Sequence, residues 1–112
     1  FSGRLKDIVI RGGMNISAEE IERYLIEHPA VRDVAVIGYP DHVLGEKLLA
    51  CIVPAGDGPA LEELNRFLVD EKKIALFKQI ERLELLNELP RNPVGKLLKR
   101  ELRATFSQNG DK

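Results

Sequence analysis

VRDVAVIG at residues 31–38 and KLLACIVP at residues 47–54 are two apolar runs, each of a length typical of a β-strand. In the first run both alternating registers become apolar towards the end, which predicts a strand buried on both faces. Residues 39–42 read Tyr-Pro-Asp-His and predict the turn that joins the two strands. A third apolar run, at residues 80–86, predicts another strand of the same sheet.

An N-terminal β-hairpin is predicted ahead of these strands. Residues 5–11 include a β-branched run, and residues 14–16 resume an extended pattern after the glycine pair Gly12 and Gly13. Two adjacent glycines between extended segments are typical of a tight hairpin turn.

Three helices complete the pattern. Ser17 and Glu20 have the spacing of a capping box, which predicts a helix start with reciprocal side-chain bonds to the two backbone amides. That helix places His28 at its C-terminus, where the helix dipole favours a cation. A second helix is predicted over residues 59–72, with Pro59 in its first turn. A terminal helix is marked by Leu98, Leu102 and Phe106.

The order of these elements is typical of an α+β fold: a small three-stranded sheet with packed helices, plus the N-terminal hairpin. A chain of 112 residues that is 44% hydrophobic is long enough for one core and too short for two. We expect residues 1–106 to form this domain and residues 107–112 to fray. The only methionine is Met14, so we expect a fragment of a longer protein.

Composition excludes several classes of function. Seventeen Lys and Arg against 18 Asp and Glu give a net charge of −1, which argues against nucleic-acid binding. No run approaches the roughly 20 apolar residues of a membrane span, and the first residues have neither the charged region nor the apolar run expected of a signal peptide. The single cysteine, Cys51, lies in an apolar run, which predicts a buried side chain and a reducing, cytoplasmic location. Two histidines and one cysteine give no metal-ligand spacing, so no metal site is expected in this chain.

Lys96 is a candidate catalytic residue because of the segment before it. Pro90 and Pro93 restrict the backbone, so the loop should hold Lys96 away from the sheet and present it to solvent. The start of the following helix adds partial positive charge, which suits an anion. The alternative is a solvated cation in a basic helix face that includes Lys99 and Arg100.

The turn at Gly12 and Gly13 is a second candidate site. Arg4, Lys6 and Arg11 lie near it in sequence, and a glycine pair between cations can cradle a phosphate. The spacing is not that of a phosphate-binding loop or a dinucleotide fold. A hairpin turn flanked by solvated charges is the alternative.

Four segments together resemble a known family. They are GRLKD (residues 3–7), IRGGMNI (10–16), EIE (20–22) and LPRNPVGK (89–96). In this order and separation they resemble the C-terminal domain of the adenylate-forming superfamily, which includes acyl-CoA synthetases, adenylation domains of peptide synthetases and luciferases.

The resemblance implies a two-step ligase that uses ATP, Mg²⁺ and coenzyme A. Such enzymes join a carboxylic acid to ATP and then transfer the acyl group to a thiol. Lys96 matches the lysine that acts in the first step, Lys6 matches the hinge, and Arg4 matches an arginine that approaches the nucleotide. The N-terminal adenylation domain of the same protein would hold most of the ATP and Mg²⁺ contacts, so this domain alone should be inactive.

For the second step the resemblance implies a thiol tunnel, lined by Gly12, Gly13, Asn15 and Ile16. Lys78 matches a residue that contacts coenzyme A phosphates, although Ile80 replaces a proline common in that segment. Leu44 and Val94 also depart from common family residues. An acid-CoA ligase for a fatty, alicyclic or aromatic acid is the leading interpretation. The alternatives are an acid-AMP ligase that loads a carrier protein, and a non-catalytic module that binds acidic partners through its basic helix.

Overall fold

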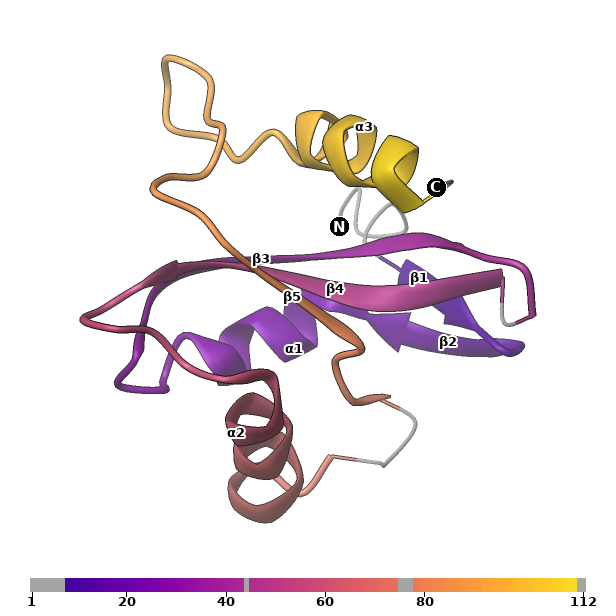
Figure 1. The fold of residues 1–112 in the computed structure, drawn as a ribbon, viewed down its shortest axis with the longest axis horizontal. Helices are drawn as coiled ribbons and strands as arrows, with labels where there is room; N and C mark the ends of the chain where they lie inside the picture. Colours follow the sequence, from indigo (N-terminus) through magenta and orange to yellow (C-terminus); the bar gives the residue numbers. More distant parts are fainter. Residues whose placement is uncertain (1–7, 44, 75–77, 111–112) are drawn as a thin grey trace.

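A mixed sheet lies between two helical layers, with α1 and α2 on one face and α3 on the other (Figure 1). The computed structural model describes residues 8–43, 45–74 and 78–110. The strands are β1 (Ile8–Arg11), β2 (Met14–Ser17), β3 (Val31–Asp41), β4 (Gly45–Pro54) and β5 (Arg82–Leu85). The helices are α1 (Ala18–Leu25), α2 (Leu61–Arg66), its π-helical continuation η2 (Phe67–Glu71) and α3 (Lys99–Gly110).

The sheet order is β2-β1-β4-β3, and β5 pairs with β4 on the edge of β4 opposite β3. β3 and β4 form a long antiparallel pair, whereas β5 runs parallel to β4. β1 touches β4 at Arg11 and Gly45, so the β1–β2 hairpin extends from one end of the central strands. The predicted α+β class, with a three-stranded sheet and an N-terminal hairpin, is confirmed. The predicted fraying of residues 107–112 stays a prediction.

The core divides into two clusters, one on each face of the sheet. Ala35, Val36 and Ile37 are consecutive and all buried, because their side chains alternate between these clusters. The larger cluster packs beneath α1, α2 and η2, and the smaller one beneath α3. Burial of β3 on both faces is therefore confirmed.

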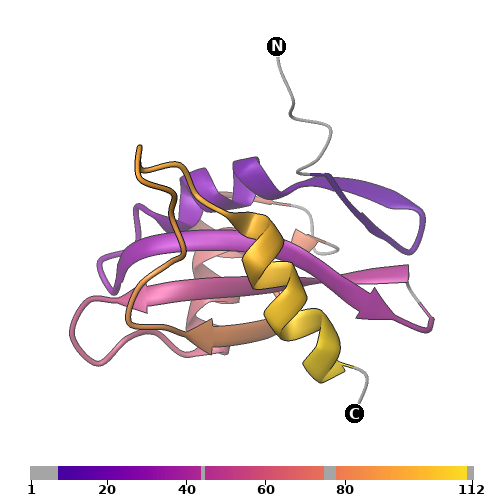
Figure 2. The ribbon, with the colours of Figure 1, turned by 90° about the horizontal axis from the view of Figure 1, so that it is seen from above.

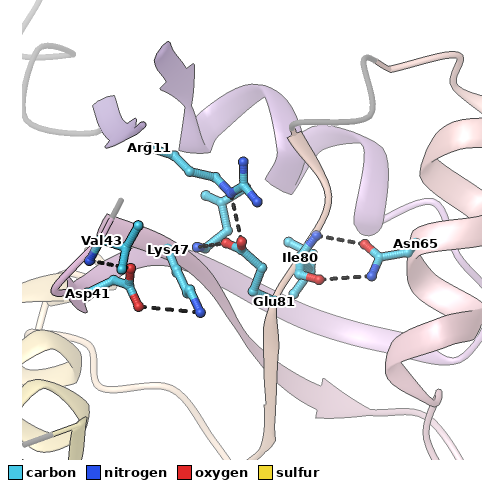
Figure 3. Close-up of polar contacts among 8 residues, drawn as sticks. Arg11, Asp41, Val43, Lys47, Asn65, Ile80 and Glu81 are labelled. Carbon is cyan, nitrogen blue, oxygen red and sulfur yellow. Dashed lines mark hydrogen bonds and ion pairs between the residues drawn. The ribbon is translucent and has the colours of Figure 1, made fainter. Parts of the chain in front are cut away.

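The turn predicted at residues 39–42 begins later than predicted, at His42. β3 continues through Pro40 to Asp41, and Pro40 lies opposite Glu46 of β4. Because β3 is an edge strand in this sheet, the missing N–H of Pro40 removes no ladder bond on its open side. The chain reverses after Asp41, whose carboxylate accepts a hydrogen bond from the Val43 amide at 3.0 Å (Figure 3).

The N-terminal half of the predicted capping box is confirmed. Ser17 caps α1, and its Oγ accepts a hydrogen bond from the Glu20 amide at 3.2 Å. The Glu20 carboxylate does not return to the Ser17 amide among the described contacts; it accepts from Lys78 Nζ at 3.1 Å. The Lys78 ammonium group is thus the donor to Glu20, in place of the Ser17 amide that the capping box predicts.

His28 is predicted at the C-terminus of the first helix, but α1 ends at Leu25 and His28 lies three residues beyond it. Its side chain is buried and lies edge-on to Phe67. The Nδ1 atom accepts a hydrogen bond from the Ala30 amide at 3.0 Å, and the Nε2 atom lies 3.1 Å from Glu63. The buried His28 side chain therefore links the end of α1 to α2 and η2.

The helix predicted over residues 59–72 begins two residues later, at Leu61, and its last turn is the π-helix η2. Pro59 therefore precedes the helix instead of opening it. Asn65 of α2 makes two hydrogen bonds to the backbone of Ile80, 2.6 Å to the amide and 2.8 Å to the carbonyl (Figure 3). These bonds fix the segment that leads into β5, which is shorter than the predicted strand at residues 80–86.

α3 crosses the face of the sheet opposite α1 and α2 (Figure 2). Phe106 of α3 lies over the guanidinium of Arg82, which also faces the Tyr39 ring. Around the open edge of β3, the Glu22 carboxylate accepts from the Val36 amide at 2.7 Å and from Lys99 Nζ at 2.6 Å. No helix within the described ranges is both long and apolar enough to cross a membrane.

Candidate functional site

Residues 90–98, here called the Lys96 loop, form a small hairpin that projects from the body of the domain beside α3 (Figure 1). The amide of Leu98 donates to the Pro90 carbonyl at 2.8 Å, and Arg91 pairs with Leu97. Gly95 has φ +91°, a conformation that side chains rarely adopt, although a Cβ there would meet no atom within 4 Å. Glycine is therefore required at the turn for its backbone and not for lack of space.

Lys96 lies on this loop, three residues before α3 begins at Lys99, and it is exposed. Within the described ranges no carboxylate forms an ion pair with its ammonium group. The prediction that Lys96 is presented to solvent is confirmed by this geometry. An unpaired ammonium group on a projecting loop is available to an anion on another surface.

The loop is stiffened by more than its two prolines. The Asn92 side chain accepts from the amides of Val94 and Lys96, and Arg91 donates to the Gly95 carbonyl and to Asp33. An asparagine directly before a proline is a turn signal that sequence reasoning could have used for Asn92. The ion pair between Arg91 and Asp33 joins residues 58 positions apart in the sequence, so no local sequence pattern predicts it.

The second candidate surface is the hairpin turn. Gly12 has φ +59° and Gly13 has φ +84°, as a two-residue hairpin loop requires. A Cβ on Gly13 would meet no atom within 4 Å, so open space lies on that side of the turn. Asn15 is exposed, whereas the Ile16 side chain is fully buried in the core. Only the backbone of Ile16 is therefore placed to contribute to a surface.

Lys78 belongs with the hairpin and not with the Lys96 loop. Its ammonium group lies 3.1 Å from Glu20, in the first turn of α1, directly after β2. The hairpin is also linked to the start of β5: Arg11 Nε donates to Glu81 at 2.7 Å, and the other oxygen of Glu81 accepts from the Leu48 amide at 2.9 Å (Figure 3). This carboxylate joins three segments near the place where β1 meets β4.

The structure does not bring the two candidate surfaces together. The Lys96 loop and the hairpin turn lie at opposite ends of the sheet in both views (Figures 1 and 2). Three further predicted or noted positions, Arg4, Lys6 and Leu44, lie outside the described residues.

Two titratable groups that belong to neither surface have shifted pKa values: Cys51 is buried, and Tyr39 is partly buried. Burial raises the pKa of the Cys51 thiol to about 12, and the nearby Glu84 carboxylate adds to the effect. Burial also raises the pKa of Tyr39 above its ordinary value of 10.0. In the described part of the chain, no three His, Cys, Asp or Glu side chains form a group suited to a metal ion.

The family model of the AMP-binding enzyme C-terminal domain matches residues 20–96. This chain belongs to that family. The resemblance to the C-terminal domain of the adenylate-forming superfamily is thereby confirmed. The matched segment contains most of α1, the strands β3 to β5 and the Lys96 loop up to Lys96 itself.

Curated relatives of this AMP-binding enzyme C-terminal domain are much longer proteins. The 2,3-dihydroxybenzoate-AMP ligase of Bacillus subtilis is 41% identical over 106 residues, which cover 95% of this chain and 20% of the relative. The fatty acid–[acyl-carrier-protein] ligase ScoC of Streptomyces coeruleorubidus is 42% identical over 104 residues, 92% of this chain and 20% of the relative. The domain thus spans about a fifth of the length of these relatives.

A solved structure shares the fold of this AMP-binding enzyme C-terminal domain. The fatty acyl CoA synthetase of Mycobacterium tuberculosis superposes with a TM-score of 0.86 and 36% sequence identity, over 95% of this chain and 21% of that one.

Proposed function

We propose that this chain is the mobile C-terminal domain of an AMP-forming acid-CoA ligase that acts on a fatty, alicyclic or aromatic carboxylic acid. The observation that carries the proposal is the exposed Lys96 on a projecting, internally bonded loop, with no carboxylate partner in the described ranges. The family membership supports the same function.

In the first reaction a carboxylate oxygen of the acid attacks the α-phosphorus of ATP, and the bond from that phosphorus to the bridging oxygen of pyrophosphate breaks. Negative charge increases on the phosphate oxygens in the transition state. The Lys96 ammonium group neutralises that charge from the end of a long side chain. The N-terminal adenylation domain holds the nucleotide and Mg²⁺, and Arg4 approaches the nucleotide.

In the second reaction the sulfur of coenzyme A attacks the acyl carbon, AMP leaves with the bonding electrons, and the thiol proton passes to solvent. For this step the domain rotates about Lys6 and presents the hairpin turn. Gly12, Gly13 and Asn15 line the path of the thiol arm, and the backbone of Ile16 contributes to the same surface. The separation of the two candidate surfaces supports this use, because one domain then offers a different end for each step.

Lys78, which lies before β5 and beside the first turn of α1, would meet the phosphates of coenzyme A. Its pairing with Glu20 places a carboxylate beside it, so phosphate binding would require the ammonium group to exchange partners or to share them. An acid-AMP ligase that loads a carrier protein is the second candidate, because ScoC is a carrier-protein ligase of similar identity. The intact enzyme, offered each thiol in turn, distinguishes the two. We place the enzyme in the cytoplasm, in keeping with its reduced, buried Cys51.

The test is the substitution Lys96→Ala in the full-length protein that contains this chain. Adenylate formation should fall roughly 100- to 1000-fold, because a donor to the developing charge is lost. Thioester formation from supplied acyl-adenylate should keep its rate, because the hairpin surface is unchanged. The two half-reactions are measured separately, by pyrophosphate release and by thioester yield.

Arg100→Ala is the matched control, since it removes an exposed cation from the first turn of α3 without touching the Lys96 loop. It should leave both half-reactions unchanged. A non-catalytic module that binds acidic partners through its basic helix predicts the opposite: similar, salt-sensitive losses of binding in both variants and no kinetic defect specific to Lys96.

A further inference from the structure

Both main-chain groups of Lys96 bond to one residue. The Lys96 amide donates to Asn92 Oδ1 at 2.9 Å, and the Lys96 carbonyl accepts from the Asn92 amide at 2.9 Å. Asn92 Oδ1 also accepts from the Val94 amide at 3.1 Å, and the Asn92 carbonyl accepts from the Gly95 amide at 2.8 Å. Asn92 therefore closes the turn and fixes the backbone from which the Lys96 side chain starts.

Arg91 connects this turn to the sheet. One guanidinium nitrogen donates to the Gly95 carbonyl at 3.0 Å, and the other lies 2.7 Å from Asp33 of β3. Asp33 is itself fixed, because its second oxygen accepts from the Val34 amide at 2.9 Å. A planar guanidinium with two donors can hold both partners at once, whereas a lysine ammonium has no such fixed fork.

The Arg91–Asp33 ion pair is too exposed to matter much for the stability of the fold. The Arg91 side chain is 40% exposed and that of Asp33 is 32% exposed. Such pairs contribute little free energy of unfolding in water. The geometry of the Arg91–Asp33 pair nevertheless limits how far the Lys96 loop can move relative to the sheet. This restraint matters because the long side chain of Lys96 is flexible and does not fix its own direction.

We propose that Asn92 and Arg91, the latter through Asp33, are positioning residues for Lys96 in adenylate formation. The inference rests on the proposed function. Asn92 sets the backbone of Lys96, and Arg91 sets the direction of the whole loop. A displacement of about 1 Å at a reacting group can cost on the order of 100-fold in rate, so loss of either anchor slows the first reaction.

The experiment measures both half-reactions of the full-length protein with the variants Asn92→Leu and Arg91→Ala. Adenylate formation should fall about 10- to 100-fold, with kcat changing more than the KM for ATP, and thioester formation from supplied adenylate should persist. Asn92→Asp keeps the accepting oxygen and should restore most of the rate.

Asp33→Ala tests transmission from the sheet. It should also slow adenylate formation, and the double variant should be no slower than Arg91→Ala alone, because Arg91→Ala already removes the link to Asp33. Arg32→Ala is the matched control, since it removes an exposed cation of β3 beside Asp33, and it should have no effect.

Three results would overturn the inference. In the first, Lys96→Ala abolishes adenylate formation while Asn92→Leu and Arg91→Ala leave it unchanged; the proposed function then survives without the positioning role. In the second, both half-reactions fall equally in Asn92→Leu and Arg91→Ala, which indicates general damage to the fold. In the third, Lys96→Ala itself has no effect, and the proposed function fails together with the inference.

Discussion

Cys51 illustrates how a reactive residue type becomes inert through its position. It lies in β4 between Ala35 of β3 and Glu84 of β5, with none of its side chain exposed. Burial raises the pKa of its thiol from 9.0 to about 12. Because the thiolate is the nucleophile, the folded protein should not react with thiol reagents at neutral pH.

This shift predicts how stability depends on pH. Below pH 9 the thiol keeps its proton in the folded and unfolded states, so this group leaves the free energy of unfolding constant. Between pH 9 and about 12 only the unfolded thiol releases its proton, and the free energy of unfolding should fall as pH rises. The slope from this group is at most about 1.4 kcal/mol per pH unit.

Urea unfolding of the protein and of Cys51→Val, at several pH values above 9, checks this prediction. Lysines and tyrosines contribute equally in both proteins. The difference between the two slopes of unfolding free energy against pH therefore isolates the contribution of the thiol. Equal slopes, or rapid reaction of the folded protein with a thiol reagent, would show that Cys51 is not held in its protonated form.

At the level of elements, the end of the second helix contains a backbone conformation that its residue does not favour. Lys73 has φ +59° and is exposed, directly after the cap residue Lys72 of η2. The following Ile74 is buried, and its amide donates to the Leu68 carbonyl at 3.2 Å. The left-handed conformation of Lys73 thus turns the chain so that Ile74 returns to the core. Glycine usually occupies this left-handed position after a helix.

Lys73→Gly should therefore stabilise the protein by up to about 1 kcal/mol, because glycine adopts the left-handed conformation without steric cost. Thermal unfolding measures the change as a higher midpoint. Lys72→Gly is the matched control: Lys72 has φ −102°, so the same replacement one residue earlier removes no strain and should lower the midpoint. A lower midpoint for Lys73→Gly would contradict the assignment.

At the level of the whole molecule, the Lys96 loop and the hairpin turn lie at opposite ends of the sheet, so under the proposed function a change at one surface should affect only one half-reaction. Gly13 has φ +84° and open space where a Cβ would lie. Asparagine tolerates positive φ better than other residues with side chains, so Gly13→Asn should keep the turn while filling that space. If the thiol arm passes there, thioester formation should slow about 10- to 100-fold and adenylate formation should not change.

Gly56→Asn provides the matched control in the loop that follows β4. Gly56 also has positive φ, +73°, and a Cβ there would also meet nothing within 4 Å. Normal thioester formation in Gly13→Asn would remove the hairpin turn from the thiol path. A defect of the same size in Gly56→Asn would attribute the loss to the backbone instead of the site.

The local patterns of the chain fix the elements and the types of candidate residues. Apolar runs predict β3 and β4, the glycine pair predicts the hairpin turn, and two prolines predict that Lys96 is exposed. These features depend on the periodicity of apolar residues and on the backbone restrictions that glycine and proline impose. Both properties are local, so a short segment of sequence is enough to predict them. The boundaries that failed, such as the predicted turn at residues 39–42, depended on a property of the sheet: Pro40 is tolerated because β3 is at its edge.

Tertiary structure alone decides which distant residues meet. Asp33 reaches Arg91 across 58 positions, Glu22 reaches Lys99 around the edge of β3, and the buried His28 side chain lies 3.1 Å from Glu63 of α2. It also decides that the two candidate surfaces lie at opposite ends of one sheet. These relations depend on how the strands pair and on which faces of the sheet the helices cover. The sequence around each residue therefore does not predict them.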